Sequence, residues 1–407
     1  LGQLEYKPLD WYFERRKASR SYKMFLPIDK CALYLCDARI KERGKYSTGY
    51  EDPPTVPLIV LEIQSEGVSG FGEFLPTSLF YPAGSVGVSN YEEWSEMIAI
   101  CSGLIGKDAV NLRRLIPEKY TTDENASGMV DCVDFALHDL VGKAKGIPAY
   151  TLLGGKLRDS VPVMPVIYTD EIQVMADRAV ELQGATGVGM FKIKPHADFD
   201  TDVKMMQKLS ARLKPGTKFL FDANYAYKTA DEAAEALTAV AKYGVFIAED
   251  PVDVEMHVYG DTLKPRLNKA GIKLMLDEKA RDTACVVEIV RDGLADVINY
   301  HANWHSGFAG CLERAAFVSL SGLENYIGSS CYMGIADAAN IMLASVTPKL
   351  IVCEQVRCAD FYLLDYVVSD FYTLSDGRYQ IPDLPGLGIT VDRSRLEALT
   401  QRTEVLR

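Results

Sequence analysis

The sequence of 407 residues lacks the features that mark several large protein classes. No apolar run approaches the roughly 18 residues that a membrane-spanning helix needs, and residues 1–16 carry mixed charge without the apolar run of a signal peptide. The net charge is −12, and no basic run offsets it in a way that would favour a phosphate backbone. We therefore expect a cytoplasmic protein with neither a membrane nor a nucleic-acid partner.

Cysteine and histidine are also used sparingly. The nine cysteines are scattered singly with no CxxC pair, which is typical of buried, reduced thiols rather than of disulfides or a zinc site. Only five histidines are present. A site built from His and Cys ligands is therefore not expected, and a bound metal would be a hard cation held by oxygen atoms.

The composition that remains is that of an ordinary globular chain, with 48% hydrophobic and 25% charged residues. Its length predicts two domains or one large barrel. Residues 1–26 form an extension, after which strand-like runs at 31–36 and 56–63 precede helical patterning from about 91 to 146. Strands followed by helices predict an α+β domain.

From about residue 161, short apolar runs alternate with amphipathic helical stretches. The polar residues that follow five of the runs lie 28, 27, 28 and 24 residues apart, and are Lys194, Asp222, Glu249, Asp277 and His301. A strand, a crossover helix and two loops need about 30 residues, so the spacing predicts βα units and a parallel sheet. Seven or eight units favour a closed barrel, and no GxGxxG follows an early strand to indicate an open dinucleotide-binding sheet.

Two lysines stand at the end of the second run. Lys192 and Lys194 share one face of a strand, so their charges should repel and one pKa should fall toward neutrality. Such a lysine is a candidate general base. For an isolated Lys-x-Lys, however, two solvated lysines on an edge strand are the commoner arrangement.

Three carboxylates end the next three runs. In a closed barrel Asp222, Glu249 and Asp277 would converge at the C-terminal ends of the strands, where catalytic residues gather. Several carboxylates close together require a cation. Mg²⁺ is typically bound by only a few protein oxygens, which leaves room for water and substrate to bind it as well. Each could instead cap the helix that follows, although three in register argue against that interpretation.

The ordered motifs resemble the enolase superfamily, in its mandelate racemase and muconate lactonizing branch. The resemblance covers about residues 27–390 and rests on Gly70-Phe-Gly-Glu73, Asp134–Lys143, Phe191-Lys-Ile-Lys194, Phe221-Asp-Ala-Asn224, Ala248-Glu-Asp-Pro251 and Leu276-Asp-Glu278. It implies a (β/α)7β modified TIM barrel with an α+β capping domain. Residues 1–155 would form the cap, 156–358 the barrel, and 359–407 a C-terminal segment that returns to the cap.

The resemblance also implies roles for individual residues. Lys194 would be the base with Lys192 as its electrostatic neighbour, and Asp222, Glu249 and Asp277 would bind Mg²⁺. Glu278 is an alternative third ligand. Residues expected to orient ligands or bind substrate are Asn224, Glu278 and Tyr168.

His301 departs from the pattern, because it stands where the muconate branch has a second lysine. It is either an acid or base facing Lys194 or a structural histidine.

The implied activity is magnesium-dependent removal of the proton α to a carboxylate through an enediolate. The outcome would be elimination, cycloisomerisation or epimerisation of a small carboxylic acid by a lyase or isomerase. One alternative is an acid-sugar dehydratase in which His301 protonates the leaving hydroxyl, and another is a metal-binding barrel scaffold without turnover. We expect a homo-oligomer, with substrate specificity set by loops at 37–54 and 76–90.

Overall fold

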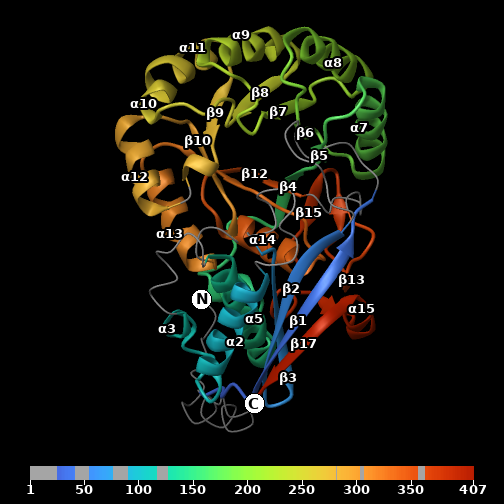
Figure 1. Cartoon of the computed structure of the whole chain (residues 1–407), viewed down its shortest axis with the longest axis vertical. Helices are drawn as coiled ribbons and strands as arrows, with labels where there is room; N and C mark the ends of the chain where they lie inside the picture. Colours follow the sequence, from blue (N-terminus) through green and yellow to red (C-terminus); the bar gives the residue numbers. More distant parts are fainter. Residues whose placement is uncertain are drawn as a thin grey trace, which may run out of the picture.

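The computed structural model describes residues 25–41, 55–76, 90–116, 127–280, 282–302, 307–355 and 363–407. Most of the predicted extension, and residues 42–54 and 77–89 of the two expected specificity loops, lie outside these ranges. The barrel occupies the upper part of Figure 1 and the cap the lower part. No helix within the described ranges is both long enough and apolar enough to cross a membrane.

A closed parallel barrel forms the larger unit. Its strands are β4 (Ser160–Met164), β5 (Val166–Ile167), β6 (Met190–Ile193), β7 (Lys218–Asp222), β8 (Val245–Glu249), β9 (Lys273–Leu276), β10 (Val297–Tyr300), β11 (Glu324–Ile327) and β12 (Leu350–Glu354). Only Pro165 separates β4 from β5. Because β4 pairs with β12 and β5 pairs with β6, this interrupted strand closes the sheet on itself. The predicted closed barrel is thus confirmed.

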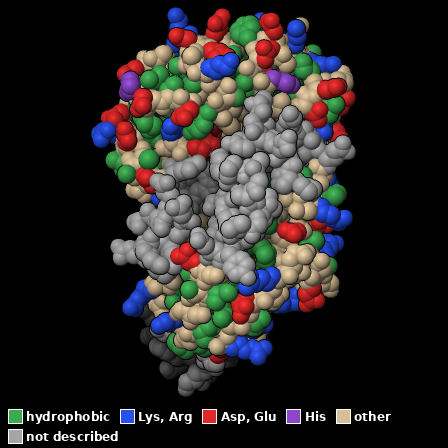
Figure 2. Space-filling model, in the orientation of Figure 1, with side chains coloured by type: hydrophobic (Ala, Val, Ile, Leu, Met, Phe, Trp, Pro, Cys, Tyr) green, Lys and Arg blue, Asp and Glu red, His purple; other side chains and the backbone are tan. Residues whose placement is uncertain are grey.

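Helices cover the outside of the barrel, one crossover after each strand but the last (Figure 1). They are α7 (Ile172–Thr186), α8 (Phe199–Arg212), α9 (Ala230–Val240), α10 (Met256–Val258) with η3 (Tyr259–Leu263) and α11 (Lys264–Lys269), α12 (Thr283–Asp292), α13 (Gly307–Leu320) and α14 (Ile335–Val346). This order gives the expected (β/α)7β architecture. On the face in Figure 2, acidic and basic side chains are intermixed over these helices.

The capping domain is an antiparallel sheet packed against helices. Its strands are β1 (Lys30–Arg39), β2 (Thr55–Ser65), β3 (Val68–Phe74) and β17 (Thr400–Leu406), and its helices are α2 (Asn90–Leu104), α3 (Leu112–Leu115), α5 (Ser127–Lys145) and α6 (Ala149–Leu152). The strand β1 extends to Arg39, beyond the predicted start of the first loop. The register of β17 on β1 brings the end of the chain back to the cap.

The C-terminal segment reaches the cap by way of the barrel. Its first elements are β13 (Val368–Asp370), β14 (Leu374–Ser375), β15 (Arg378–Gln380) and β16 (Thr390–Val391). Of these, β15 pairs antiparallel with barrel strand β4. Later in the segment, α15 (Arg393–Leu399) and β17 lie against the capping sheet.

Two glycines allow the cap to be compact. A Cβ atom on Gly70 would lie 2.2 Å from the Ala136 carbonyl oxygen, and one on Gly72 would lie 1.8 Å from the Cys132 carbonyl oxygen. Both distances are well inside van der Waals contact, so β3 can lie this close to α5 only without side chains at these positions. This explains the spacing of the Gly70-Phe-Gly-Glu73 motif.

Glu73, the next residue of that motif, joins the cap to the barrel. Its carboxylate is fully buried and accepts hydrogen bonds from the backbone N–H groups of Met333, Ile335 and Ala336 at the start of α14, at 2.5, 2.9 and 3.0 Å. At the other end of this completely buried helix, the Arg158 guanidinium donates to the carbonyl groups of Ala344 and Thr347. An anion at the N-terminus and a cation at the C-terminus complement the helix dipole and satisfy otherwise unpaired groups.

We therefore expect Glu73→Gln to destabilise the protein by about 2–3 kcal/mol, since it removes a charged acceptor from three buried donors. Urea unfolding followed by circular dichroism measures this loss. Glu235→Gln, on the exposed face of α9, is the matched control and should change stability by less than about 0.5 kcal/mol. Equal effects of the two substitutions would contradict the capping role.

The contact of Glu62 with Arg393 should make stability depend on acid pH. Burial raises the pKa of Glu62, but hydrogen bonds from Arg393, Ser69 and Gln64 outweigh burial and lower this pKa from 4.5 to about 2. A carboxyl with a depressed folded pKa stabilises the fold above its ordinary pKa and loses that contribution as the pH falls toward the folded value.

Arg393→Gln should accordingly cost about 1–2 kcal/mol at pH 7, because the guanidinium is half exposed and its charge is partly screened. The difference between the free energies of unfolding of wild type and Arg393→Gln should become smaller as the pH falls from about 4.5 to about 2. Unfolding curves across this range test the prediction, with the exposed Arg395→Gln as control. A pH-independent difference would rule out Glu62 as the titrating partner.

Candidate active site at the barrel mouth

A layer of apolar side chains closes the lower part of the barrel and determines which residues face its mouth. This interior cluster contains Met164, Leu220, Ile247, Met275, Val297, Tyr326 and Val352, with Met190 packed against it. Strand side chains alternate in direction, so the residue two positions further along each strand points inward at the next level. Those residues are Lys192, Asp222, Glu249, Asp277, Asn299, Gly328 and Glu354.

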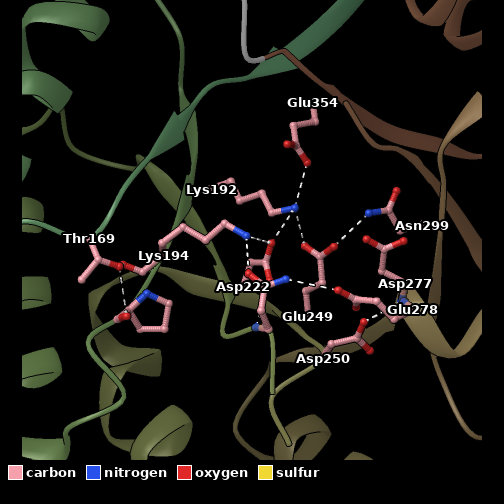
Figure 3. A network of polar contacts seen from close by, with 12 residues as sticks. Thr169, Lys192, Lys194, Asp222, Glu249, Asp250, Asp277, Glu278, Asn299 and Glu354 are labelled. Atoms are coloured by element: carbon pink, nitrogen blue, oxygen red, sulfur yellow. Dashed lines mark hydrogen bonds and ion pairs between the residues drawn. The ribbon is translucent and has the colours of Figure 1, made fainter. Parts of the chain in front are cut away.

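The three predicted carboxylates lie at adjacent strand ends (Figure 3). Asp222 and Glu249 are register partners on β7 and β8, and Asp277 directly follows β9. All three are buried. Helices α9 and α12, which follow Asp222 and Asp277, are capped by Thr229 and Asp282, and the N-cap of α10, which follows Glu249, is Glu255. The carboxylates therefore do not cap these helices.

Lys192 lies at the centre of the cluster. Its Nζ is 2.8 Å from Asp222 Oδ2, 2.8 Å from Glu249 Oε2 and 2.8 Å from Glu354 Oε2. Burial alone would lower the pKa of Lys192, but the three carboxylate charges outweigh burial and raise it well above its ordinary range. The acidic neighbours, rather than the second lysine, therefore dominate the surroundings of Lys192.

Lys194 follows the last residue of β6 and lies to one side of the carboxylates. Its Nζ is 2.6 Å from Asp222 Oδ2 and also donates to Asn224 Oδ1. Asn224 lies past the end of β7 in a left-handed turn, with φ of 42°. Its Nδ2 donates to Glu278 Oε1 at 3.3 Å, so Asn224 links the lysine to the loop after β9.

The backbone of Lys194 is held as well, because Thr169 Oγ1 donates to its carbonyl oxygen at 3.0 Å. Tyr168, the residue before Thr169, is buried directly after β5.

The surroundings shift the pKa values of Asp222 and Glu249 in opposite directions. Burial raises the pKa of Asp222, but the ammonium groups of Lys192 and Lys194 outweigh it and lower this pKa to about 2. Burial and the charge of Asp222 together raise the pKa of Glu249 well above its ordinary value. The ionised form of Asp222 is thus stabilised, whereas ionisation of Glu249 requires additional positive charge nearby.

His301 lies on the opposite side of the cluster. Its Nε2 is 3.0 Å from Asp277 Oδ2 and 3.2 Å from Asn299 Nδ2, which also donates to Glu249 Oε1 at 2.8 Å. Burial lowers the pKa of His301, but the Asp277 carboxylate outweighs it and the net shift is upward. Space for the ring depends on Gly328, where a Cβ atom would lie 2.3 Å from His301 Nε2.

Asp277 and Glu278 occupy different surroundings. The charge of Asp277 contributes to the raised pKa of Glu249, after burial and Asp222, which places Asp277 within the carboxylate cluster. Glu278 instead pairs with Asn224 and is only half buried. Asp250 fixes this loop by accepting hydrogen bonds from the N–H groups of Asp277 and Glu278 at 3.1 and 2.9 Å. This arrangement favours Asp277 as the third ligand.

Sequence reasoning missed Glu354 and Asn299. Glu354 directly follows the apolar residues 350–353, so the same rule that found Asp222 and Glu249 applies to it. Asn299 lies two residues beyond Val297 of the interior cluster. Both could have been found from strand alternation at the sixth and eighth barrel strands.

The oxygen donors of Asp222, Glu249 and Asp277 fit a hard divalent cation. Asp277 Oδ1 is buried and accepts no hydrogen bond from the described residues, so its lone pairs remain available to a metal ion. As they stand, no three acidic, His or Cys side chains of the described chain are arranged to hold a metal ion. Lys192 Nζ contacts both Asp222 and Glu249 and supplies positive charge there.

Comparison with known families agrees with this geometry. Residues 174–395 match the family described as enolase C-terminal domain-like, and residues 41–154 match the mandelate racemase / muconate lactonizing enzyme N-terminal domain. The chain belongs to the mandelate racemase/muconate lactonizing branch of the enolase superfamily. The two matched regions of this superfamily member cover most of the cap and most of the barrel.

Relatives of this superfamily member include isomerases and a cis-3-hydroxy-L-proline dehydratase. It is 22% identical over 382 residues to the N-succinyl-L-Arg/Lys racemase of Bacillus cereus, covering 92% of this chain and 99% of the racemase. It is 25% identical over 353 residues to a chloromuconate cycloisomerase of Pseudomonas putida, covering 84% and 91%. A dipeptide epimerase from Cytophaga hutchinsonii, solved with Mg and D-Ala-L-Val, superposes with a TM-score of 0.80 at 20% identity, covering 94% of this chain and 100% of the epimerase.

We expect the full chain to bind one Mg²⁺ ion, with Asp222→Asn weakening the affinity at least about tenfold because a charged ligand is lost. Calorimetric titration of chelator-treated protein measures both affinities. Asp231→Asn, an exposed aspartate on α9, is the control and should bind like wild type. An unchanged affinity in Asp222→Asn would remove Asp222 from the ligand set.

Proposed function

We propose that this protein removes the proton α to the carboxylate of a small carboxylic acid, with Mg²⁺ as cofactor. The outcome is an epimerised, cycloisomerised or eliminated product formed through an enediolate. The observation that carries the proposal is the placement of Lys194 and His301 on opposite sides of the carboxylate cluster, one on Asp222 and the other on Asp277. The isomerase activities of the relatives support the same reaction class.

Lys194 is the proposed base. It lies beyond the end of β6 at the level of the mouth, whereas Lys192 lies one pleat deeper between three carboxylates. The deeper position of Lys192 within β6 leaves Lys194 nearer to a substrate above the strand ends. Lys192 therefore supplies positive charge, and Lys194 Nζ takes the proton.

Asp222, Glu249 and Asp277 are the proposed metal ligands. Mg²⁺ bound there would supply the positive charge that stabilises the enediolate. Asn224 holds Lys194 and contacts Glu278, so it orients the base relative to the ligands. Closely packed side chains beneath the site exclude water from the barrel interior.

A second candidate function, dehydration of an acid sugar, is favoured by the imidazole at position 301. His301 lies across the cluster from Lys194 and could protonate a departing hydroxyl group. His301→Asn separates the two outcomes. A dehydratase should then retain exchange of the α-proton with solvent and lose the elimination product.

The role of Lys194 can be tested by exchange of the α-proton in D₂O with Mg²⁺ present, followed by proton NMR. Suitable probes are N-succinyl-L-lysine, D-Ala-L-Val and acid sugars. We expect Lys194→Ala to reduce exchange at least about 1,000-fold, because the proposed base is lost. Lys192→Ala should slow exchange less, and should also shift its pH profile.

Lys218→Ala, an exposed lysine at the opposite end of β7, is the control and should exchange like wild type. Exchange that persists in Lys194→Ala but disappears in Lys192→Ala would reverse the assignment. A wild-type chain that binds Mg²⁺ and exchanges none of the probes would favour a scaffold without turnover.

A further inference from the structure

The Lys192 ammonium contacts three buried carboxylates in the candidate site (Figure 3). Its three carboxylate partners come from β7, β8 and β12, each at 2.8 Å. Nζ donates a hydrogen bond to Glu354 Oε2 and forms ion pairs with Asp222 and Glu249. The Tyr326 ring lies 5.8 Å from Nζ, and only 4% of the Lys192 side chain is exposed. Lys192 therefore occupies a built cation site.

Two of these partners have a second use. Asp222 and Glu249 are the proposed metal ligands, and the oxygens that face Lys192 cannot bind an ammonium and a divalent ion with full strength at once. Glu354 differs, because it lies at the end of β12 and belongs to no proposed ligand set. Tyr326 fixes Glu354 by donating a hydrogen bond to Oε2 at 3.1 Å.

We propose that Lys192 is a replaceable internal cation that holds the metal ligands until a divalent ion arrives. In the metal-free chain its ammonium neutralises Asp222 and contacts Glu249. On metal binding it gives up these two partners and remains with Glu354. The inference rests on the proposed function only in taking Asp222 and Glu249 as metal ligands.

The energetics favour such an exchange. Buried carboxylates without a counter-ion are costly, so an empty site lacking Lys192 would destabilise the barrel. The four-carbon stem of lysine is flexible enough for Nζ to move between neighbouring carboxylates. Lys194 cannot take over this task from its present position, because its Nζ contacts Asp222 from the side of Asn224.

Exchange predicts opposite effects of two substitutions on metal affinity. Lys192→Met removes the competitor, so Mg²⁺ should bind about tenfold more tightly or better. Glu354→Gln removes the acceptor that receives the displaced ammonium, so Mg²⁺ should bind at least about threefold more weakly. A merely structural role for both residues would weaken binding in both variants.

The double variant distinguishes two ways in which Glu354 could affect Mg²⁺ affinity, by accepting the displaced ammonium or by its charge alone. If Glu354 acts by accepting the ammonium, Glu354→Gln should have no effect in a chain that already carries Lys192→Met. If it acts only through its charge, the weakening should persist there. The expected affinity of the double variant is therefore that of Lys192→Met within about twofold.

The experiment is calorimetric titration of the full, chelator-treated chain with MgCl₂, combined with thermal melting with and without the metal. Lys192→Met should melt below wild type without metal, and Mg²⁺ should raise its melting temperature more than it raises that of wild type. Lys218→Met controls for the loss of a lysine elsewhere on the barrel. Glu354→Gln alone keeps the test decisive if Lys192→Met does not fold.

The proposal is supported if Lys192→Met binds Mg²⁺ more tightly than wild type and Glu354→Gln binds it more weakly. The double variant should then have the Mg²⁺ affinity of Lys192→Met. Weaker or unchanged Mg²⁺ binding in Lys192→Met, or unchanged or tighter binding in Glu354→Gln, would overturn it. In that case the proposed function stands as long as wild type binds Mg²⁺ and Asp222→Asn does not. A wild-type chain that binds no Mg²⁺ would overturn both.

Discussion

Burial of like charges at the barrel mouth is the constraint on which the candidate site depends. Asp222, Glu249, Asp277 and Glu354 all point inward above the same apolar floor. Their charges are tolerable only because a cation from a neighbouring strand contacts each part of the cluster. Lys192 serves its centre, Lys194 one side and His301 the other. The positions of the catalytic candidates therefore follow from charge balance as much as from catalysis.

The same mouth is tied to the capping domain through the segment between β11 and α14. At its start, Gly328 leaves room for the His301 ring. At its end, Glu73 of strand β3 holds the N-terminus of α14, and Arg158 holds the C-terminus of that helix. Because α14 is buried along its whole length, it transmits the position of the cap directly to this edge of the site. The Gly70-Phe-Gly-Glu73 motif thus has a physical role at the domain junction.

Much of this arrangement could be predicted from local sequence. The regular spacing of apolar runs indicates βα units, and strand alternation places Lys192, Asp222 and Glu249 toward the mouth. Pairing between distant segments could not be predicted in this way. The ion pair between Lys192 and Glu354 joins residues 162 positions apart, and it contributes to the raised pKa of Lys192. The pairing of β15 with barrel strand β4 likewise depends on tertiary structure, and no pattern in the local sequence predicts it.

Charge balance also constrains the order in which ligands can bind under the proposed function. The four carboxylates of the cluster outnumber Lys192, Lys194 and His301, and the first two carboxylates are already engaged by lysine. An anionic substrate entering this cluster would meet excess negative charge in a site of low dielectric. A bound divalent ion would offset the excess negative charge and leave the ammonium groups available to the substrate carboxylate. The carboxylic acid should therefore bind after the metal, and the acidic excess at the mouth is what makes the metal a precondition for its entry.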